Sequence, residues 1–172
     1  WLLGPYGTGF FWVSREWSDR LVCGPFYWQA LEGARDFHSL PLHNLRITPG
    51  ARRWDSPETA SFTNLAALDA SLDLLVKVGT AAIAKHNDAL MSEIVERLPR
   101  DRCVLASPAE RERRGPYVCV SARKPERNRE LLERLRAAQI FVSLRENSLR
   151  ISAHLYNTSE HVSRLLHVLS AS

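Results

Sequence analysis

Residues 1–15 read Trp-Leu-Leu-Gly-Pro-Tyr-Gly-Thr-Gly-Phe-Phe-Trp-Val-Ser-Arg, a glycine-rich turn followed at once by an apolar run. The glycines at positions 4, 7 and 9 permit positive φ and a close approach of other groups to the backbone. The aromatic and β-branched residues from Phe10 to Val13 predict a buried strand over residues 9–14. A turn and strand with no basic and apolar leader before them are typical of the interior of a longer protein.

Two further stretches stand out, Arg52-Arg-Trp-Asp-Ser-Pro-Glu-Thr-Ala-Ser-Phe62 and Leu149-Arg-Ile-Ser-Ala-His-Leu-Tyr-Asn-Thr158. With the glycine turn, they resemble in order and spacing three segments of the class V aminotransferases. These are fold type I enzymes that use pyridoxal 5'-phosphate and are related to cysteine desulfurases and isopenicillin N epimerase-like enzymes. In that family the Schiff-base lysine stands just ahead of the glycine turn, which here would place it before Trp1. The resemblance implies the C-terminal half of such a protein, without a catalytic residue of its own.

The resemblance implies an α/β fold class in three parts. Residues 1–62 would be a remnant of the large cofactor-binding domain, residues 63–98 long connecting helices, and residues 99–172 a small C-terminal α/β domain. The residues themselves agree, because strand-like and helix-like segments alternate after residue 100. We expect strands at 103–105, 117–121, 140–144 and 149–153, helices at 125–138 and 158–169, and a turn at 146–148 with positive φ at Asn147.

Apolar residues at helical spacing predict two helices ahead of this region. Asp55 and Glu58 are three residues apart, as in a capping box, so we expect the first helix to start there. Gly79 and Thr80 interrupt the pattern, since glycine suits a C-terminal cap and threonine a new N-cap. The second helix is predicted to run to about Leu98.

Residues 16–49 are rich in aromatic and turn-forming residues, and we expect irregular structure there. So many aromatic side chains need a covering surface, either a partner subunit or the rest of the same protein. Class V aminotransferases are dimers with active sites at the subunit boundary. The resemblance therefore implies a homodimer.

Composition excludes several classes of protein. The formal net charge is +4, and acidic residues interrupt the basic runs, without aromatic interleaving or zinc-ligand spacing. Such runs are usually solvated faces, so we expect no nucleic-acid partner. Cys23, Cys103 and Cys119 are odd in number and far apart, which argues against a disulfide framework or a metal site and favours the cytoplasm. No apolar run approaches the roughly 18 residues that span a bilayer, so we expect no membrane association.

Arg150 is the residue that we expect to bind substrate. A guanidinium is a fixed planar fork that matches a carboxylate, and in the family the arginine of this signature holds the substrate α-carboxylate. The resemblance thus implies an amino acid as substrate; without the motif, Arg150 would be interpreted as a solvated strand arginine. His154 and Tyr156 are expected to fix the path of that strand. Asn157 is expected to cap the closing helix, with Glu160 completing the capping pattern.

The resemblance also implies contacts to the cofactor. In relatives a threonine ahead of the long helix reaches the cofactor phosphate of the partner subunit, and Thr59 stands at that position. Unpaired amides at a helix N-terminus favour an anion there, but Glu58 would repel it, so helix capping is the alternative role. The glycine turn precedes a predicted strand, which is not the arrangement of a nucleotide loop. It would instead pass beside the cofactor, with Gly7, and Thr8 or Tyr6, near it.

Cysteine desulfurases carry a catalytic cysteine shortly before the final arginine motif, whereas this chain reads Phe141-Val-Ser-Leu-Arg-Glu-Asn147 there. Desulfurase activity is therefore not expected. We expect part of a pyridoxal-phosphate-dependent class V aminotransferase-like enzyme, whose scaffold also supports epimerisation and β-elimination. The alternative is a non-catalytic α/β binding or interaction module, which the missing lysine and the self-contained layer after residue 100 favour.

Overall fold

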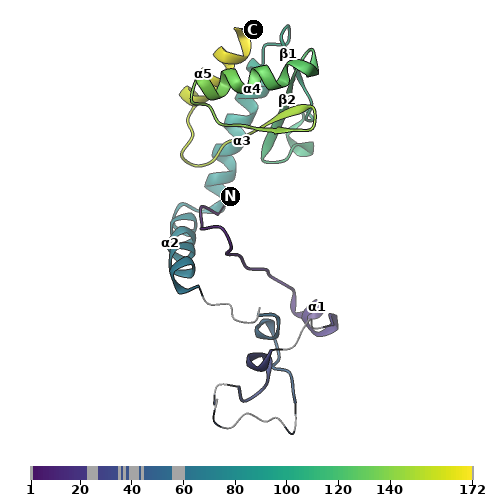
Figure 1. Cartoon of the computed structure of the whole chain (residues 1–172), viewed down its shortest axis with the longest axis vertical. Coiled ribbons are helices and arrows are strands. Elements are labelled where there is room, and N and C mark those ends of the chain that lie inside the picture. The colour runs from purple at the N-terminus through teal and green to yellow at the C-terminus, as the bar shows by residue number, and fades with distance from the viewer. Residues whose placement is uncertain are drawn as a thin grey trace. The chain divides into compact units, whose positions relative to one another are not determined.

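The computed structural model of the chain describes residues 2–22, 27–34, 36, 38, 43, 45–55 and 61–171. Contacts divide it into two compact units, Leu2–Asp73 and Leu74–Ser172 (Figure 1). The predictions that concern Cys23, Glu58 and Thr59 lie outside the described residues. No helix in the described ranges combines the length and the apolar composition that crossing a bilayer requires.

The first unit consists of short helical elements followed by a long helix. These are α1 (Arg15–Arg20), the 3₁₀ helices η1 (Trp28–Ala30) and η3 (Ala51–Trp54), and α2 (Phe62–Val78), whose residues from Leu74 onward belong to the second unit. The strand predicted over residues 9–14 is wrong: no regular element forms there, and the described strands offer it no partner. The irregular structure predicted from residue 16 is interrupted by α1, which Ser14 caps by accepting a hydrogen bond from the N–H of Trp17 at 3.4 Å.

The start of the glycine-rich turn lies against α2. Ser71 Oγ donates a hydrogen bond to the carbonyl of Leu3 at 3.0 Å. A Cβ atom added to Gly4 would come within 2.7 Å of Leu68 Cδ1, so only glycine fits here without a shift of that side chain. The glycine pattern at this point therefore serves close packing against a helix.

The two connecting helices form, but their starts differ from the predicted ones. α2 begins at Phe62, and Asp55 instead caps the C-terminus of η3. Gly79 separates α2 from α3 (Thr80–Arg97), as predicted, with a φ of 87° that favours glycine. Gly79 is also the N-cap of α3, a role predicted for Thr80, because Thr80 is already the first helical residue.

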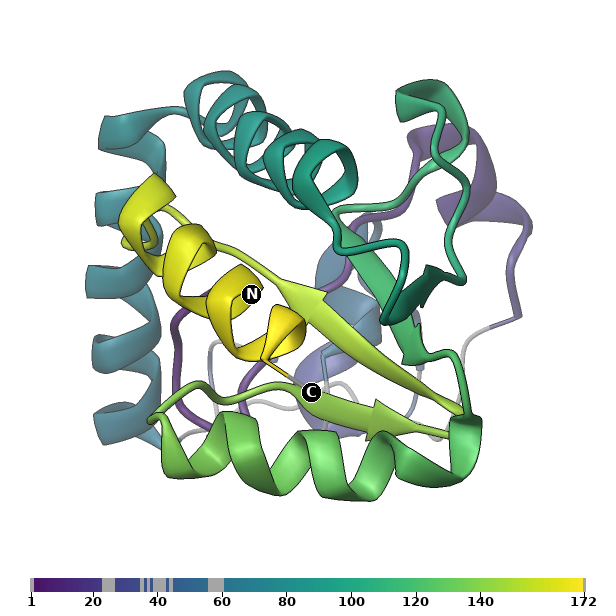
Figure 2. The ribbon, with the colours of Figure 1, turned by 90° about the horizontal axis from the view of Figure 1, so that it is seen from above.

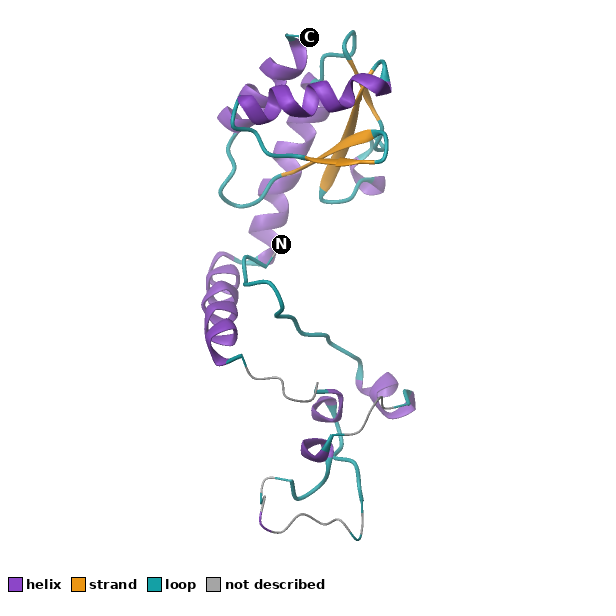
Figure 3. Ribbon diagram, in the orientation of Figure 1, coloured by secondary structure: helices purple, strands orange, loops and turns teal. Residues whose placement is uncertain are grey.

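The second unit is a four-stranded antiparallel sheet with helices packed on one face (Figures 2 and 3). The spatial order is β1-β2-β4-β3. The strands are β1 (Cys103–Leu105), β2 (Tyr117–Ala122), β3 (Ser143–Arg145) and β4 (Ser148–Ser152). The helices besides α3 are η4 (Arg111–Arg113), η5 (Pro125–Arg127), α4 (Asn128–Ala137) and α5 (Ser159–Ser170). The elements predicted after residue 100 therefore form, with boundaries shifted by a few residues.

The core of this unit lies between the sheet and α3, α4 and α5. Over residues 117–120 of β2 and along β4, every second residue is buried, which is the pattern of a sheet with one covered face. The buried strand residues are Val118, Val120, Leu149 and Ile151, and they meet the helix residues Leu90, Met91, Ile94, Leu131, Leu135, Leu165 and Leu169.

The turn between β3 and β4 differs from the prediction in one respect. Glu146, not Asn147, has positive φ, at 49°. Asn147 is held instead through its carbonyl oxygen, which accepts a hydrogen bond from Asn128 Nδ2 at 2.7 Å. This tertiary contact decides which turn residue takes the left-handed conformation, against the local preference for asparagine.

Candidate functional site

The outer face of the sheet, away from the helices, carries the signature arginine. Side chains alternate along a strand, so the inward-facing Val118 and Ile151 leave Cys119 and Arg150 on the outer face. The register pairs Cys119 with Arg150 and places Tyr117 diagonally across from Arg150. Both Tyr117 and Arg150 are exposed. An aromatic ring and a cation thus lie side by side on an open surface.

The guanidinium of Arg150 lies over the ring of Tyr117, with Cζ 5.5 Å from the ring centroid. This is within the range of a cation–π contact, and it restricts the position of the arginine side chain. Among the residues that the structure describes, no carboxylate lies within ion-pair distance of Arg150, whereas Arg111 pairs with Asp88 at 2.5 Å. The N–H donors of Arg150 are therefore open to an external carboxylate.

The turn after β4 is closed by hydrogen bonds. The N–H of His154 donates to Asn157 Oδ1, and the N–H of Asn157 donates to the carbonyl of His154, both at 2.9 Å. The buried ring of His154 stacks on Tyr156, with centroids 5.6 Å apart. Nε2 of His86, on α3, lies 2.9 Å from the carbonyl oxygen of Asn157. These contacts fix the chain directly after the strand that carries Arg150.

The cap of α5 differs from the prediction. Thr158, not Asn157, is the N-cap, because Asn157 uses its side chain to close the turn. The partner in the capping box is His161 rather than Glu160: the N–H of Thr158 donates to His161 Nδ1 at 3.1 Å. Sequence reasoning missed His86 altogether, since a single histidine on a helix carries no signal of a contact with a distant turn.

A cavity of about 470 Å³ lies beside this turn. Its lining includes Phe141, Ser152, Tyr156 and Arg164, but not Arg150. The candidate carboxylate-binding group therefore stands on the open face of the sheet and not inside this cavity.

The glycine turn belongs to the first unit and Arg150 to the second. Gly7 has a φ of 80°, and a Cβ added to it would meet no atom within 4 Å. Thr8 Oγ1 donates a hydrogen bond to the carbonyl of Pro5 at 2.6 Å. Gly7 thus shapes the turn, and the Thr8 hydroxyl closes it.

No protein-family model matches the chain. Over 170 residues it is 26% identical to the uncharacterised aminotransferase YcbU of Bacillus subtilis (strain 168), an alignment that covers 99% of this chain and 42% of that protein. The apo structure of a cysteine desulfurase from Thermococcus onnurineus NA1 matches with a TM-score of 0.72 at 17% identity, over 91% of this chain and 40% of that one.

A cystine C-S lyase, solved in complex with its product cysteine persulfide, matches with a TM-score of 0.70 at 20% identity, over 99% of this chain and 44% of that one. The chain has the fold of the C-terminal part of a class V aminotransferase. The α/β fold class and the resemblance seen in the sequence are thereby confirmed. The chain spans less than half the length of these relatives.

The segment ahead of the arginine signature bears on the expectation against desulfurase chemistry. Residues 141–147 contain no cysteine; they include the whole of β3, and Phe141, which precedes it, is 78% exposed. The structural relatives include desulfurases, but their similarity establishes the fold alone. The expectation against desulfurase chemistry stays a prediction, which rests on the absence of a cysteine from residues 141–147.

The cofactor of class V aminotransferases, pyridoxal 5'-phosphate, needs a lysine and several phosphate donors. Lys77, Lys85 and Lys124 are all exposed and lie outside the glycine turn. The hydroxyl proton of Thr8 is committed to Pro5, so a phosphate contact would require that hydrogen bond to break. The described residues therefore do not form a cofactor site by themselves. No group of His, Cys, Asp or Glu side chains in the described ranges is arranged to hold a metal ion.

Proposed function

We propose that the chain is the C-terminal part of a pyridoxal-phosphate-dependent enzyme of the class V aminotransferase type. Its substrate is an amino acid or another amino-group donor, whose carboxylate is held by Arg150. The observation that carries this proposal is the exposed guanidinium on β4, which rests on Tyr117 and has no carboxylate partner among the described residues. The fold and the aminotransferase name of the B. subtilis relative support it.

Arg150 acts in this proposal by orientation. Two parallel N–H···O bonds to a carboxylate fix both the position and the rotation of the substrate, which a single point charge does not. The ring of Tyr117 and the closed turn after β4 restrict the arginine before the substrate arrives, so less rotamer freedom is lost on binding. The cofactor, when bound, supplies an electron sink for the carbanion at the substrate Cα.

The cofactor contacts and the assembly belong to the same proposal. Gly7, Thr8 and Thr59 are the residues that we propose to lie near the cofactor in the intact protein, which works as a cytoplasmic homodimer. Exposed aromatic side chains in the first unit favour burial against a partner subunit: Phe10 is 65% and Trp12 is 82% exposed. Sedimentation of the intact protein checks this part of the proposal, and a monomer would contradict it.

Steady-state kinetics of the intact, cofactor-loaded protein test the role of Arg150. We expect Arg150→Lys to weaken binding of the amino acid by about 2–4 kcal/mol, because the bidentate pair is lost in a site that the bound substrate and the rest of the intact protein partly desolvate. Arg145→Lys is the matched control, since Arg145 is exposed on the neighbouring strand β3. Equal kcat and KM values for both variants would show that Arg150 does not hold the substrate carboxylate.

The second candidate function is a non-catalytic binding or interaction module. It is favoured by the continuous core of the second unit, which the strands and helices after residue 74 complete among themselves. The visible absorbance of the purified intact protein, with the intact mass measured after borohydride reduction, separates the two functions. Stoichiometric covalent cofactor supports the enzyme, and its absence after incubation with pyridoxal phosphate supports the module.

A further inference from the structure

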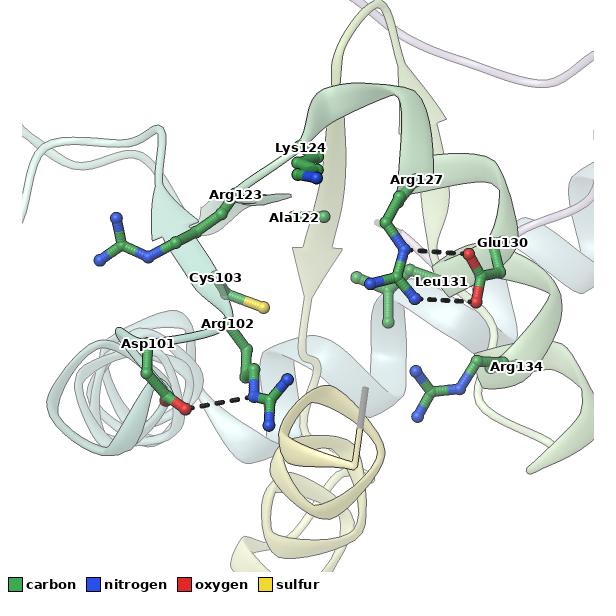
Figure 4. Close-up of a pocket in the computed structure, with 10 residues that line it drawn as sticks. All are labelled: Asp101, Arg102, Cys103, Ala122, Arg123, Lys124, Arg127, Glu130, Leu131 and Arg134. Carbon is green, nitrogen blue, oxygen red and sulfur yellow. Dashed lines mark hydrogen bonds and ion pairs between the residues drawn. The ribbon is translucent and has the colours of Figure 1, made fainter.

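A basic cleft lies on a different side of the second unit from the sheet face that carries Arg150. It has a volume of about 160 Å³ and is bounded by the turn before β1, the end of β2 and the first turns of α4. In Figure 4 the side chains of Arg102, Arg127 and Arg134 enter it from opposite sides, and the sulfur of Cys103 points between them. Three separate elements thus direct cations at one space.

Positive charge exceeds negative charge in this cleft. Lys124 adds a fourth cation, against the two carboxylates Asp101 and Glu130. A fifth, Arg123, donates two hydrogen bonds to the carbonyl of Arg100, and Figure 4 shows its guanidinium turned away from the space. A concave surface with an excess of one sign of charge attracts ions of the opposite sign.

Each of the three guanidinium groups is held by the protein and still keeps donors. Arg102 Nε contacts Asp101 at 3.2 Å, and Arg134 Nη2 donates to the carbonyl of Val168 at 2.9 Å. Arg127 donates through Nε and Nη2 to Glu130, at 3.1 and 3.0 Å. A guanidinium has five N–H donors, so every one of these side chains retains some for a ligand.

The thiol of Cys103, which also lines the cleft, does not repel an anion. Burial raises the pKa of the Cys103 thiol above its ordinary value, and the nearby Asp101 carboxylate raises it further. The thiol is therefore neutral at physiological pH and adds no negative charge.

We propose that this cleft binds the phosphate group of a small ligand. A carboxylate has two oxygens in one plane and is satisfied by one guanidinium fork, whereas a phosphate presents oxygens in several directions. Donors that converge from the turn before β1, from η5 and from α4 suit the second geometry. Free inorganic phosphate and a phosphate monoester share this chemistry, and neither requires a contact with Arg150.

Calorimetric titration of the 172-residue chain with inorganic phosphate tests the proposal. We expect saturable binding at one site per chain, weakened at least tenfold in Arg134→Gln and in Arg102→Gln. Arg129→Gln is the control, because Arg129 is exposed on α4 but does not line the cleft. Its affinity should stay within twofold of the wild type. Identical weakening in all three variants would show diffuse charge attraction and would overturn the proposal.

A charge-neutral double variant separates hydrogen bonding from net charge. Arg127→Gln combined with Glu130→Gln leaves the net charge unchanged and removes one guanidinium, so we expect phosphate affinity to fall. Glycerol 3-phosphate is the second ligand: tighter binding than inorganic phosphate assigns the cleft to a monoester, and weaker binding assigns it to the free ion. Binding of succinate as tight as that of phosphate, or no binding of either phosphate ligand, would refute the assignment. Thermal unfolding of each variant confirms that it folds.

Discussion

His86 Nε2 lies 2.9 Å from the carbonyl oxygen of Asn157, which joins α3 to the turn that follows the strand of Arg150. A carbonyl oxygen only accepts hydrogen bonds, so Nε2 of His86 carries the proton. Through this contact the first helix of the second unit supports the signature residues, although the two are 71 positions apart in the sequence.

Replacement of this histidine should destabilise the chain. His86→Ala removes the donor to Asn157, and we expect the free energy of unfolding to fall by about 1 kcal/mol. Lys85→Ala is the control, because Lys85 is exposed on the same helix. Urea unfolding of both variants gives the comparison, and equal losses would show that the contact contributes nothing.

Asn128 connects three parts of the second unit and should be more sensitive. It is 2% exposed; its Oδ1 accepts from the N–H of Ala122 at 2.7 Å, and its Nδ2 donates to the carbonyl of Asn147 at 2.7 Å. Asn128→Ala leaves two backbone groups without these partners, and we expect a loss of about 2–3 kcal/mol in chemical unfolding. The neighbouring substitution Arg129→Ala should cost much less, and a similar small cost for Asn128→Ala would contradict this role.

The ion pair between Arg127 and Glu130, at the start of α4, makes a contribution to stability that depends on pH. A hydrogen bond from Arg127 and its charge lower the pKa of Glu130 below the ordinary 4.5. Because the folded pKa is the lower one, the stabilisation is complete above pH 4.5 and is lost as the pH falls through the folded value. The stability difference between the wild type and Glu130→Gln, measured by unfolding from pH 7 to pH 3, should shrink on acidification. A difference that does not change with pH would exclude this linkage.

Gly79 provides a test of the junction between α2 and α3. Its φ of 87° is unfavourable for a side chain, so Gly79→Ala should destabilise the chain by about 1–2 kcal/mol. Gly9→Ala is the matched control, since a Cβ at Gly9 meets no atom within 4 Å and its φ is not in the left-handed region. Thermal unfolding measures the stability of both variants. A Gly79→Ala variant as stable as the wild type would show that the junction tolerates a side chain.

Much of the second unit was predictable because its signals are local. Short apolar runs predict the strands β1 and β2. Gly79 ends α2 because its own backbone takes a positive φ. Predictions failed where a distant partner decides the outcome. Asn147 has the local preference for positive φ, yet its bond to Asn128 leaves that role to Glu146. The aromatic run from residue 10 has the composition of a strand, but a strand forms only where another strand pairs with it.

The candidate site also combines features that local sequence predicts with features that distant contacts decide. Arg150 was identifiable because a contiguous signature surrounds it, and alternation along β4 then places it opposite the core. Its contact with Tyr117 depends on the register between β2 and β4, which no local pattern specifies. His86 was not identifiable, since its partner is a backbone carbonyl and imposes no choice of residue at position 157.

Whether Arg150 binds the substrate carboxylate is tested most directly by comparing an amino-acid substrate with its carboxamide in the intact enzyme. The carboxamide lacks the anion but keeps the amino group, so it reports every effect of a substitution other than the carboxylate contact. We predict that Arg150→Gln lowers kcat/KM for the amino acid by about 30- to 1,000-fold, equivalent to about 2–4 kcal/mol, and changes that for the carboxamide little. Equal losses for both substrates, or no loss for the amino acid, would contradict carboxylate recognition by Arg150.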